Sequence, residues 1–264
     1  MNDLRKLTHE LLERRGICPK KGYGQNFLTD VQMLEKIGRS LPLDGMSAIV
    51  EIGPGLGFLT EVLLRFGLPV TVIEADPDMV GVLSDRFGEK IRIIAEDVRK
   101  VDFDLFHVKQ TLFVGNLPYN LTKDIIEVLM MLTSPLRFSV MVQKEVALKL
   151  TGGSHHLMTN ALAAFLGLKG NFGPPIDVPR AAFSPAPHVD SAFMNYHGCN
   201  PVDRSVYDFL KALYRQPKKT VANNLKAAAY DESLLPLKIG NLRPHQLTVG
   251  QLKNLVSLFV SSVI

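Results

Sequence analysis

The sequence VEIGPGLG at residues 50–57 is the strongest structural signal in this chain of 264 residues. It joins a short apolar run, residues 48–52, to three glycines spaced G-x-G-x-G. This pattern is typical of a buried strand that turns tightly into a helix, here expected at 58–66. Downstream, apolar runs and amphipathic patterns alternate at the same pitch, which predicts βαβ units around a mainly parallel sheet.

The same alternation can be followed outward in both directions from residues 50–57. Further strands are expected at 70–73, 91–95, 111–114 and 138–143, and helices at 3–15, 30–40, 77–87 and 122–132. Five prolines within 170–190 predict loops and edge segments there. Helical patterns resume at 204–215, 217–228 and 248–262, so we predict a boundary that separates a domain at 1–200 from a helical domain at 201–264.

The composition excludes several classes of protein. A hydrophobic content of 46% is enough for a packed core, so the chain is not intrinsically disordered. No apolar run approaches the ~20 residues of a membrane span, and the N-terminus has no secretory signal, so we expect no membrane partner. Two cysteines exclude a disulfide framework and favour a reducing cytoplasm. His155 and His156 have no third ligand nearby, so no metal is expected.

Charge is distributed unevenly along the chain, whose formal net charge is +4. The net charge is +2 over residues 1–45, −3 over 46–199 and +5 over 200–264. Basic ends favour an anionic partner such as RNA, although ordinary surface solvation explains the charge equally well. The cations that would contact a phosphate backbone are Arg14, Arg15, Lys20, Lys21, Arg215, Lys218, Lys219 and Lys226.

Polar residues follow four successive strands, at the sheet edge where α/β proteins bind ligands. The G-x-G-x-G spacing departs from the G-x-G-x-x-G of dinucleotide sites, and Glu51 before the turn would repel a diphosphate. Both features favour the cationic S-adenosylmethionine over NAD. Glu74 would accept the two ribose hydroxyls and Asp97 the adenine amino group, while helix or turn capping is the alternative role for each carboxylate.

Residues 116–119, Asn-Leu-Pro-Tyr, follow the fourth strand and resemble the motif of amino methyltransferases. The amino nitrogen of adenine is a poor nucleophile, so two acceptors on its N–H groups would stabilise the transition state. The Asn116 side chain and the Leu117 carbonyl can be these acceptors, and Pro118 restricts the geometry of Leu117. Tyr119 offers a ring for stacking of a flipped base. The alternative is a simple turn with a buried tyrosine.

The chain as a whole resembles the ribosomal RNA adenine dimethyltransferases, and within them the group that modifies small-subunit rRNA. The resemblance rests on GQNFL at 24–28, the turn at 50–57, VIEAD at 72–76, GNLPYN at 115–120 and FSPAP at 183–187. It extends to the segments VQKEVA at 142–147, VDS at 189–191 and KKT…NLK at 218–226. Two positions depart from the family pattern: residues 156–161 are more apolar, and His188 stands where lysine is common.

The resemblance implies a fold, a reaction and a site. The fold is a Rossmann-like class I methyltransferase domain with a small all-helical C-terminal domain. The reaction is two methyl transfers from S-adenosylmethionine to adenine N6, on the rRNA of the small ribosomal subunit, by a monomer. Tyr119 and Phe183 would sandwich the target base. The implied cofactor-binding residues are Gln25, Asn26, Leu28, Gly53, Gly55, Glu74, Asp97, Val98 and Asn116.

Three other functions compete with this interpretation. A methyltransferase of the antibiotic-resistance type, acting on large-subunit rRNA, would share the motifs at 24–27 and 116–119. A non-catalytic ribosome assembly factor could keep the fold, but the intact Asn116 and Tyr119 argue against lost catalysis. A NAD-dependent dehydrogenase is disfavoured by the glycine spacing.

Overall fold

The computed structural model of the protein describes residues 3–20, 24–132, 135–151 and 158–260. The chain forms two compact units. The first comprises residues 1–132, 136–144 and 173–196, and the second comprises residues 133–135, 145–172 and 197–264. Of the residues singled out from the sequence, Lys21, His155 and His156 lie outside the described residues.

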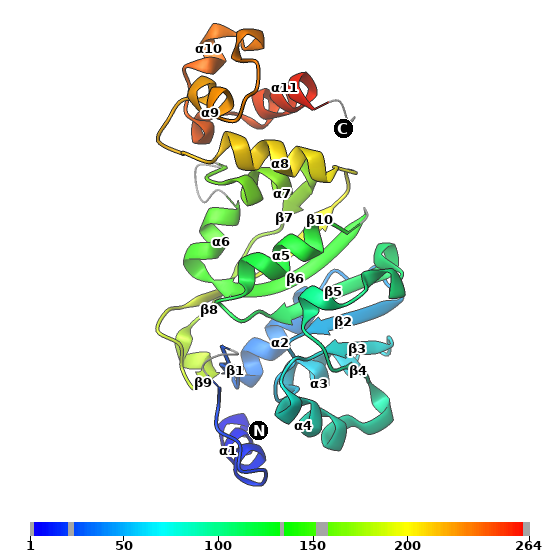
Figure 1. The fold of residues 1–264 in the computed structure, drawn as a ribbon. Helices are drawn as coiled ribbons and strands as arrows, with labels where there is room; N and C mark the ends of the chain where they lie inside the picture. Colours follow the sequence, from blue (N-terminus) through cyan, green and yellow to red (C-terminus); the bar gives the residue numbers. More distant parts are fainter. Residues whose placement is uncertain (1–2, 21–23, 133–134, 152–157, 261–264) are drawn as a thin grey trace. The chain divides into compact units, whose positions relative to one another are not determined.

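The first unit is built on the expected parallel sheet (Figure 1). Its strands β2, β3, β4, β5 and β6 pair in parallel, and β8 pairs with β10 in antiparallel fashion. In sheet order these elements are β4 (Arg92–Ile94), β3 (Val70–Ile73), β2 (Ala48–Ile52), β5 (Thr111–Asn116), β6 (Leu136–Gln143) and β10 (Ser191–Gly198), with β8 at Ile176–Val178. From β2 the chain proceeds to β3 and β4 on one side, and β5 and β6 lie on the other. The strand order therefore reverses between β2 and β5, which places the ligand-binding crevice at their carboxyl ends.

The helices of this unit begin and end close to the expected positions. They are α1 (Leu4–Glu13), α2 (Val31–Ser40), α3 (Phe58–Leu64), α4 (Pro77–Phe87) and α5 (Thr122–Met130). Local caps explain the agreement: Asp30 accepts a hydrogen bond from the Met33 amide at the start of α2, and Asp76 caps α4 just before its first residue, Pro77.

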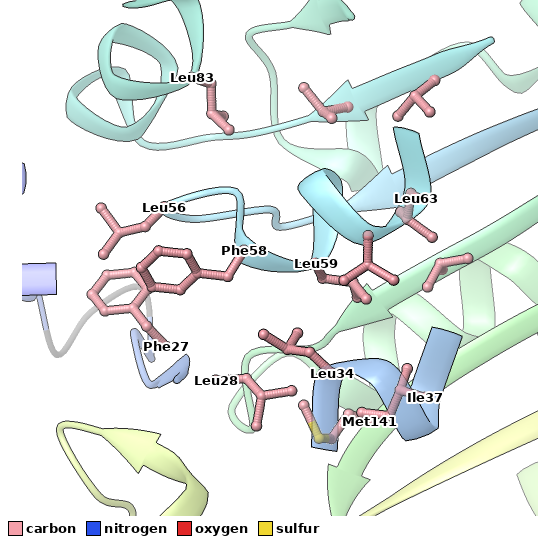
Figure 2. Packing of buried hydrophobic residues seen from close by; sticks show 14 of the residues in the cluster. Phe27, Leu28, Leu34, Ile37, Leu56, Phe58, Leu59, Leu63, Leu83 and Met141 are labelled. Atoms are coloured by element: carbon pink, nitrogen blue, oxygen red, sulfur yellow. The ribbon is translucent and has the colours of Figure 1, made fainter. Parts of the chain in front are cut away.

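The GQNFL segment is anchored to the core of the first unit. Its residues Phe27–Leu28 form β1, which pairs with β9 (Phe183–Ser184) in antiparallel fashion. Both Phe27 and Leu28 are 6% exposed and belong to the same hydrophobic cluster as residues of α2 and α3. Figure 2 shows Phe27 pointing toward Leu56 and Phe58 at the start of α3. Burial of two large apolar side chains stabilises this segment by about 1.5–3 kcal/mol each.

The second unit is mainly helical. Its elements are α6 (Lys144–Thr151), α7 (Ala161–Lys169), β7 (Gly170–Phe172), α8 (Arg204–Leu213), α9 (Val221–Ala227), α10 (Leu237–Gly240) and α11 (Val249–Phe259). Of α6, the first residue, Lys144, belongs to the first unit. Aromatic contacts form its core. Phe165 of α7 meets Tyr207 of α8 edge to face at 5.4 Å between ring centroids, and Phe209 stacks on Phe259 at 5.7 Å.

The units are divided differently from the sequence-based boundary between residues 200 and 201, which stays a prediction. Residues 145–172 group with the C-terminal helices, because α7 is buried on nearly all sides and packs on α8. A helix that is apolar all round gives no amphipathic stripe, so its partner cannot be read from the sequence. Over the described residues, every helix is too short or too polar to cross a membrane.

Candidate functional site

The four polar strand ends meet in one cavity of the first unit. Glu51, Glu74, Asp97 and Asn116 all line it, as the parallel topology requires. The cavity is also lined by all the other residues that the sequence assigned to the cofactor, which are Gln25, Asn26, Leu28, Gly53, Gly55 and Val98. Pro118 lines it as well, whereas Leu117, Tyr119 and Phe183 lie outside the set of described residues that form its wall.

The glycine turn and the GQNFL segment pack directly against each other in the wall of this cavity. Gly55 has φ +55°, a left-handed conformation, and a Cβ atom added there would lie 3.0 Å from the Phe27 ring. A side chain at this position would therefore be strained and would also push Phe27 away. The turn needs glycine here for its own geometry and for the close approach of the N-terminal segment.

Glu74 is held rigidly at the end of β3. One carboxylate oxygen accepts the Asp76 amide at 2.9 Å, and the other accepts the Gly55 amide at 3.2 Å. The side chain is buried, with the residue 7% exposed, and burial raises the pKa of Glu74. Both oxygens keep acceptor capacity toward the cavity, so they can receive a pair of neighbouring hydroxyl groups.

A second buried carboxylate, Glu51, lies behind the glycine turn. It accepts a hydrogen bond from the Thr60 hydroxyl of α3 at 2.5 Å. The residue is 1% exposed, and burial raises the pKa of Glu51 to about 8. Two buried acidic groups in one cavity wall, which a nearby cation would favour in their ionised form, suit a cationic ligand better than a diphosphate, and this fits S-adenosylmethionine.

Asp97 caps the turn that follows it, which is the alternative role predicted for it: its carboxylate accepts the Arg99 backbone amide at 2.9 Å. Arg99 binds its carboxylate in a forked arrangement, with the Nε atom 3.0 and 3.1 Å from the two oxygens and an Nη atom at 2.5 Å. This pairing lowers the pKa of Asp97. Asp97 is thus an ionised acceptor that already binds Arg99, and its role toward an adenine amino group stays a prediction.

The Asn-Leu-Pro-Tyr segment is oriented by contacts on both sides. The Asn116 amide nitrogen Nδ2 donates to the Asn26 carbonyl at 2.9 Å, which directs the oxygen Oδ1 to the opposite side. The Leu117 amide donates to the Met141 carbonyl of β6 at 3.1 Å and so fixes the peptide that joins Asn116 to Leu117. The Tyr119 hydroxyl lies 2.7 Å from the Ser191 hydroxyl of β10, and the half-buried ring is held in one orientation.

Phe183 is buried rather than exposed. It is 1% exposed and lies in the hydrophobic cluster that also holds Phe27 and Leu28. Its pairing with Leu28 in the β1–β9 ladder places it beneath the N-terminal segment. A role as the second stacking ring therefore stays a prediction, and it would require the ring to leave this packing.

The basic residues fall into two groups. The first group is exposed and comprises Arg14, Arg215, Lys218, Lys219 and Lys226. Within it, the Lys226 Nζ lies 3.1 Å from Glu232. Arg15 instead pairs with Asp85 and donates to the Gly81 carbonyl at 2.9 Å. Lys20 lies 2.6 Å from both Asp76 and Asp78. Arg15 and Lys20 therefore form ion pairs with carboxylates of the first unit.

Several supporting residues cannot be recognised from the sequence alone. Ser191 appears there only as part of the VDS segment, and Asp76 only as the last residue of the VIEAD segment. Asn224, 3% exposed, organises the basic turn before α9 by donating to the carbonyls of Gln216 and Thr220 at 3.0 Å each. Only the fold brings these partners together, so spacing gives no signal. Within the described residues, no cluster of three His, Cys, Asp or Glu side chains suits a metal ion.

Comparison with protein families and curated sequences gives consistent matches. Residues 18–252 match the family model described as ribosomal RNA adenine dimethylase. A "Ribosomal RNA small subunit methyltransferase A" of Geobacillus thermodenitrificans is 35% identical over 233 residues, covering 83% of this chain and 80% of the relative. The protein of that name from Mycoplasma capricolum is 32% identical over 261 residues, covering 92% and 98%.

Solved structures support the fold. The 23S rRNA methyltransferase ErmE superposes with a TM-score of 0.68 at 21% identity, covering 89% of this chain and 99% of that one. A dimethyladenosine transferase from Plasmodium falciparum gives a TM-score of 0.67 at 22% identity, covering 88% and 97%. The fold class predicted from the sequence, a Rossmann-like class I methyltransferase, is confirmed.

Proposed function

This chain belongs to the ribosomal RNA adenine dimethylase family and is an S-adenosylmethionine-dependent methyltransferase, and from this we propose that it converts adenines of small-subunit rRNA to N6,N6-dimethyladenosine. The observation that carries the proposal is the position of Asn116 at the wall of the cofactor cavity, in a chain whose relatives are named for the small subunit. We further propose that it acts as a monomer on the small ribosomal subunit, in the cytoplasm.

The cofactor is proposed to lie in the cavity of the first unit. Glu74 would hold the ribose hydroxyls, Asp97 and Val98 the adenine, and Glu51 would favour the positive charge. Gln25, Asn26 and Leu28 would cover the ligand, and Gly53 and Gly55 would allow its close approach. When bound, S-adenosylmethionine supplies an electrophilic methyl group on its sulfonium.

Asn116 and Leu117 are proposed to activate the target nitrogen. The Asn116 Oδ1 and the Leu117 carbonyl accept the two N–H groups of the adenine amine, which frees its lone pair from the ring and stabilises the positive charge that develops. Pro118 limits the rotation of Leu117, and the Met141 carbonyl holds the Leu117 amide. No strong general base is needed, because the methylated ammonium is acidic.

Tyr119 is proposed to stack on the flipped adenine. Replacing it in Tyr119→Ala should lower kcat/KM for rRNA by about 5- to 150-fold, since stacking of one base contributes about 1–3 kcal/mol. Tyr119→Phe keeps the ring and loses only the hydrogen bond to Ser191, so its loss should stay below about tenfold. Steady-state kinetics measures both variants, and equal losses would show that the hydroxyl, not the ring, matters.

Cofactor binding is expected to release a proton from Glu51. Its pKa of about 8 leaves most of this carboxyl neutral at pH 7, and a cation placed nearby favours the ionised form. The affinity of the wild type for S-adenosylmethionine should therefore rise with pH up to about 8 and then level off, and this rise should be absent from Glu51→Gln. Calorimetry in two buffers of different ionisation enthalpy counts the protons. Equal proton release in the wild type and the variant would contradict this prediction.

RNA is proposed to bind through exposed basic residues of the two ends, namely Arg14, Arg215, Lys218, Lys219 and Lys226. The buried amide of Asn224 organises the turn that carries Lys218 and Lys219. The sequence predicts the same role for Arg15, Lys20 and Lys21. For Arg15 and Lys20 the pairs with Asp85 and with Asp76 and Asp78 reduce the charge available to a phosphate.

The deciding experiment incubates the protein with S-adenosylmethionine and small subunits that lack the modification, followed by mass spectrometry of nucleosides. Dimethyladenosine in small-subunit rRNA supports the proposal. Methylation confined to large-subunit RNA would instead favour the resistance-type activity. Binding of subunits without any methyl transfer would leave the role of an assembly factor.

A further inference from the structure

Asp76 contacts Lys20, Gln25 and Glu74, although it does not line the cavity itself. It is fully buried, at 0% exposure, just after β3. One carboxylate oxygen lies 2.6 Å from the Lys20 ammonium, and the other accepts the Gln25 amide Nε2 at 2.7 Å. Its backbone amide donates to Glu74 at 2.9 Å. A single residue thus connects the N-terminal segment to the proposed ribose-binding carboxylate.

Lys20 completes this network. Its ammonium also lies 2.6 Å from Asp78, and its backbone amide donates to the Gln25 side-chain oxygen at 2.8 Å. The Gln25 amide is therefore held at both ends, by Lys20 and by Asp76. A buried carboxylate is costly unless it is paired and hydrogen-bonded, and Lys20 supplies the compensating charge.

The segment that this network holds reaches the reacting groups. Directly after Gln25, the Asn26 carbonyl accepts the Asn116 side chain at 2.9 Å. The next residue, Phe27, packs against Gly55 of the glycine turn. Displacement of Gln25 would therefore disturb the wall of the cofactor cavity, which Gln25, Asn26 and Phe27 help to form.

We propose that Lys20 and Asp76 are positioning residues that fix Gln25 and the following Asn26–Leu28 over the cofactor pocket and thereby set the affinity for S-adenosylmethionine. The inference rests on the proposed pocket. It gives Lys20 a role in cofactor binding in place of a phosphate contact. Asp76 acts through Gln25 and Glu74 and does not touch the reacting atoms.

The test measures cofactor and RNA binding separately on the full-length protein. Lys20→Met should raise the Kd for S-adenosylmethionine by about tenfold, the loss of one charge-assisted contact. Lys20→Arg should restore most of that affinity. In both Lys20 variants, kcat at saturating cofactor should change less than about twofold. The matched control is Lys6→Met, because the Lys6 side chain is 77% exposed and its ion pair with Glu10 is long, at 4.0 Å.

Salt dependence separates the two roles of Lys20. If it is a positioning residue, the slope of log affinity for small-subunit rRNA against log salt should be unchanged in Lys20→Met. A slope reduced by about one phosphate contact, with an unchanged cofactor Kd, would overturn the inference. For comparison, the double variant of Lys218 and Lys219 to alanine should show the opposite result, a reduced salt slope with an unchanged cofactor Kd.

Asp76→Asn extends the test within the network. It should weaken cofactor binding at least as much as Lys20→Met, and Gln25→Ala serves as the second probe if the Asp76→Asn variant fails to fold. An unchanged cofactor Kd in both Lys20→Met and Gln25→Ala would refute the proposal. Because cofactor binding is measured without RNA, this failure is distinguishable from absence of rRNA methylation.

Discussion

Asn116→Ala is expected to reduce methyl transfer by about 10²–10³-fold while most of the cofactor affinity persists. The substitution removes one of the two acceptors proposed for the adenine amine. The remaining Leu117 carbonyl cannot orient the nitrogen alone. Single-turnover assays with saturating S-adenosylmethionine and small subunits measure the loss in the chemical step directly.

A modest effect on cofactor binding is also expected, because Asn116 donates to the Asn26 carbonyl. A neutral hydrogen bond of this kind contributes about 0.5–1.5 kcal/mol, so the cofactor Kd should rise by no more than about tenfold. The control is Gln32→Ala, which removes an exposed amide side chain of α2 and should change neither quantity. Turnover of Asn116→Ala within about threefold of the wild type would remove this residue from its proposed role.

Asn116→Asp separates charge from hydrogen-bond geometry. A carboxylate still offers an acceptor to the amine, but it cannot donate to the Asn26 carbonyl and would face it with two oxygens. The structure therefore predicts weaker cofactor binding for Asn116→Asp than for Asn116→Ala. The orientation of the native amide, rather than its size, explains this order.

The parallel sheet and the cofactor cavity could be predicted because both follow from local order in the chain. Strand ends of parallel neighbours meet at one edge, so Glu51, Glu74, Asp97 and Asn116 are expected together before any contact is known. Caps such as Asp30 and Asp76 also lie next to the helices that they begin, and they are visible in the sequence.

What the sequence could not predict depends on contacts between distant segments. Only the family resemblance implies that the Phe183 ring is available for stacking; beside its prolines it reads as a core aromatic, and its pairing with Leu28 buries it there. Lys20 reads as a surface cation, yet it is paired with Asp76, 56 residues later. Charge sums treat every lysine as available to a partner, whereas the fold pairs some of them with its own carboxylates.

The affinity for cofactor should depend most strongly on Glu74. Glu74→Ala removes the proposed acceptor of both ribose hydroxyls and leaves the amides of Gly55 and Asp76 without their partner. Hydrogen bonds to charged groups contribute about 1.5–3 kcal/mol each, so the Kd for S-adenosylmethionine should rise by about 100-fold or more. Calorimetric titration measures it, with Glu89→Gln, an exposed residue after α4, as the matched control.

Glu74→Gln distinguishes binding from folding. Because burial raises the pKa of Glu74, the carboxylate carries a desolvation cost that a neutral amide avoids. The amide NH2 group would, however, face one of the two backbone N–H groups that the carboxylate accepts, so the two effects oppose each other and the Tm of this variant should stay close to that of the wild type. Loss of cofactor affinity together with an unchanged or higher Tm would show that Glu74 is retained for its ligand. A fall in both would indicate a structural role.

A ligand lacking the ribose 2′-hydroxyl makes the assignment specific. The wild type should bind the 2′-deoxy form of adenosylhomocysteine about tenfold more weakly than adenosylhomocysteine itself, because one hydrogen bond to Glu74 is lost. In Glu74→Ala that bond is already absent, so the two ligands should bind equally. If the variant still discriminated tenfold, the losses would be additive, and Glu74 would act on the glycine turn through Gly55 rather than on the ribose.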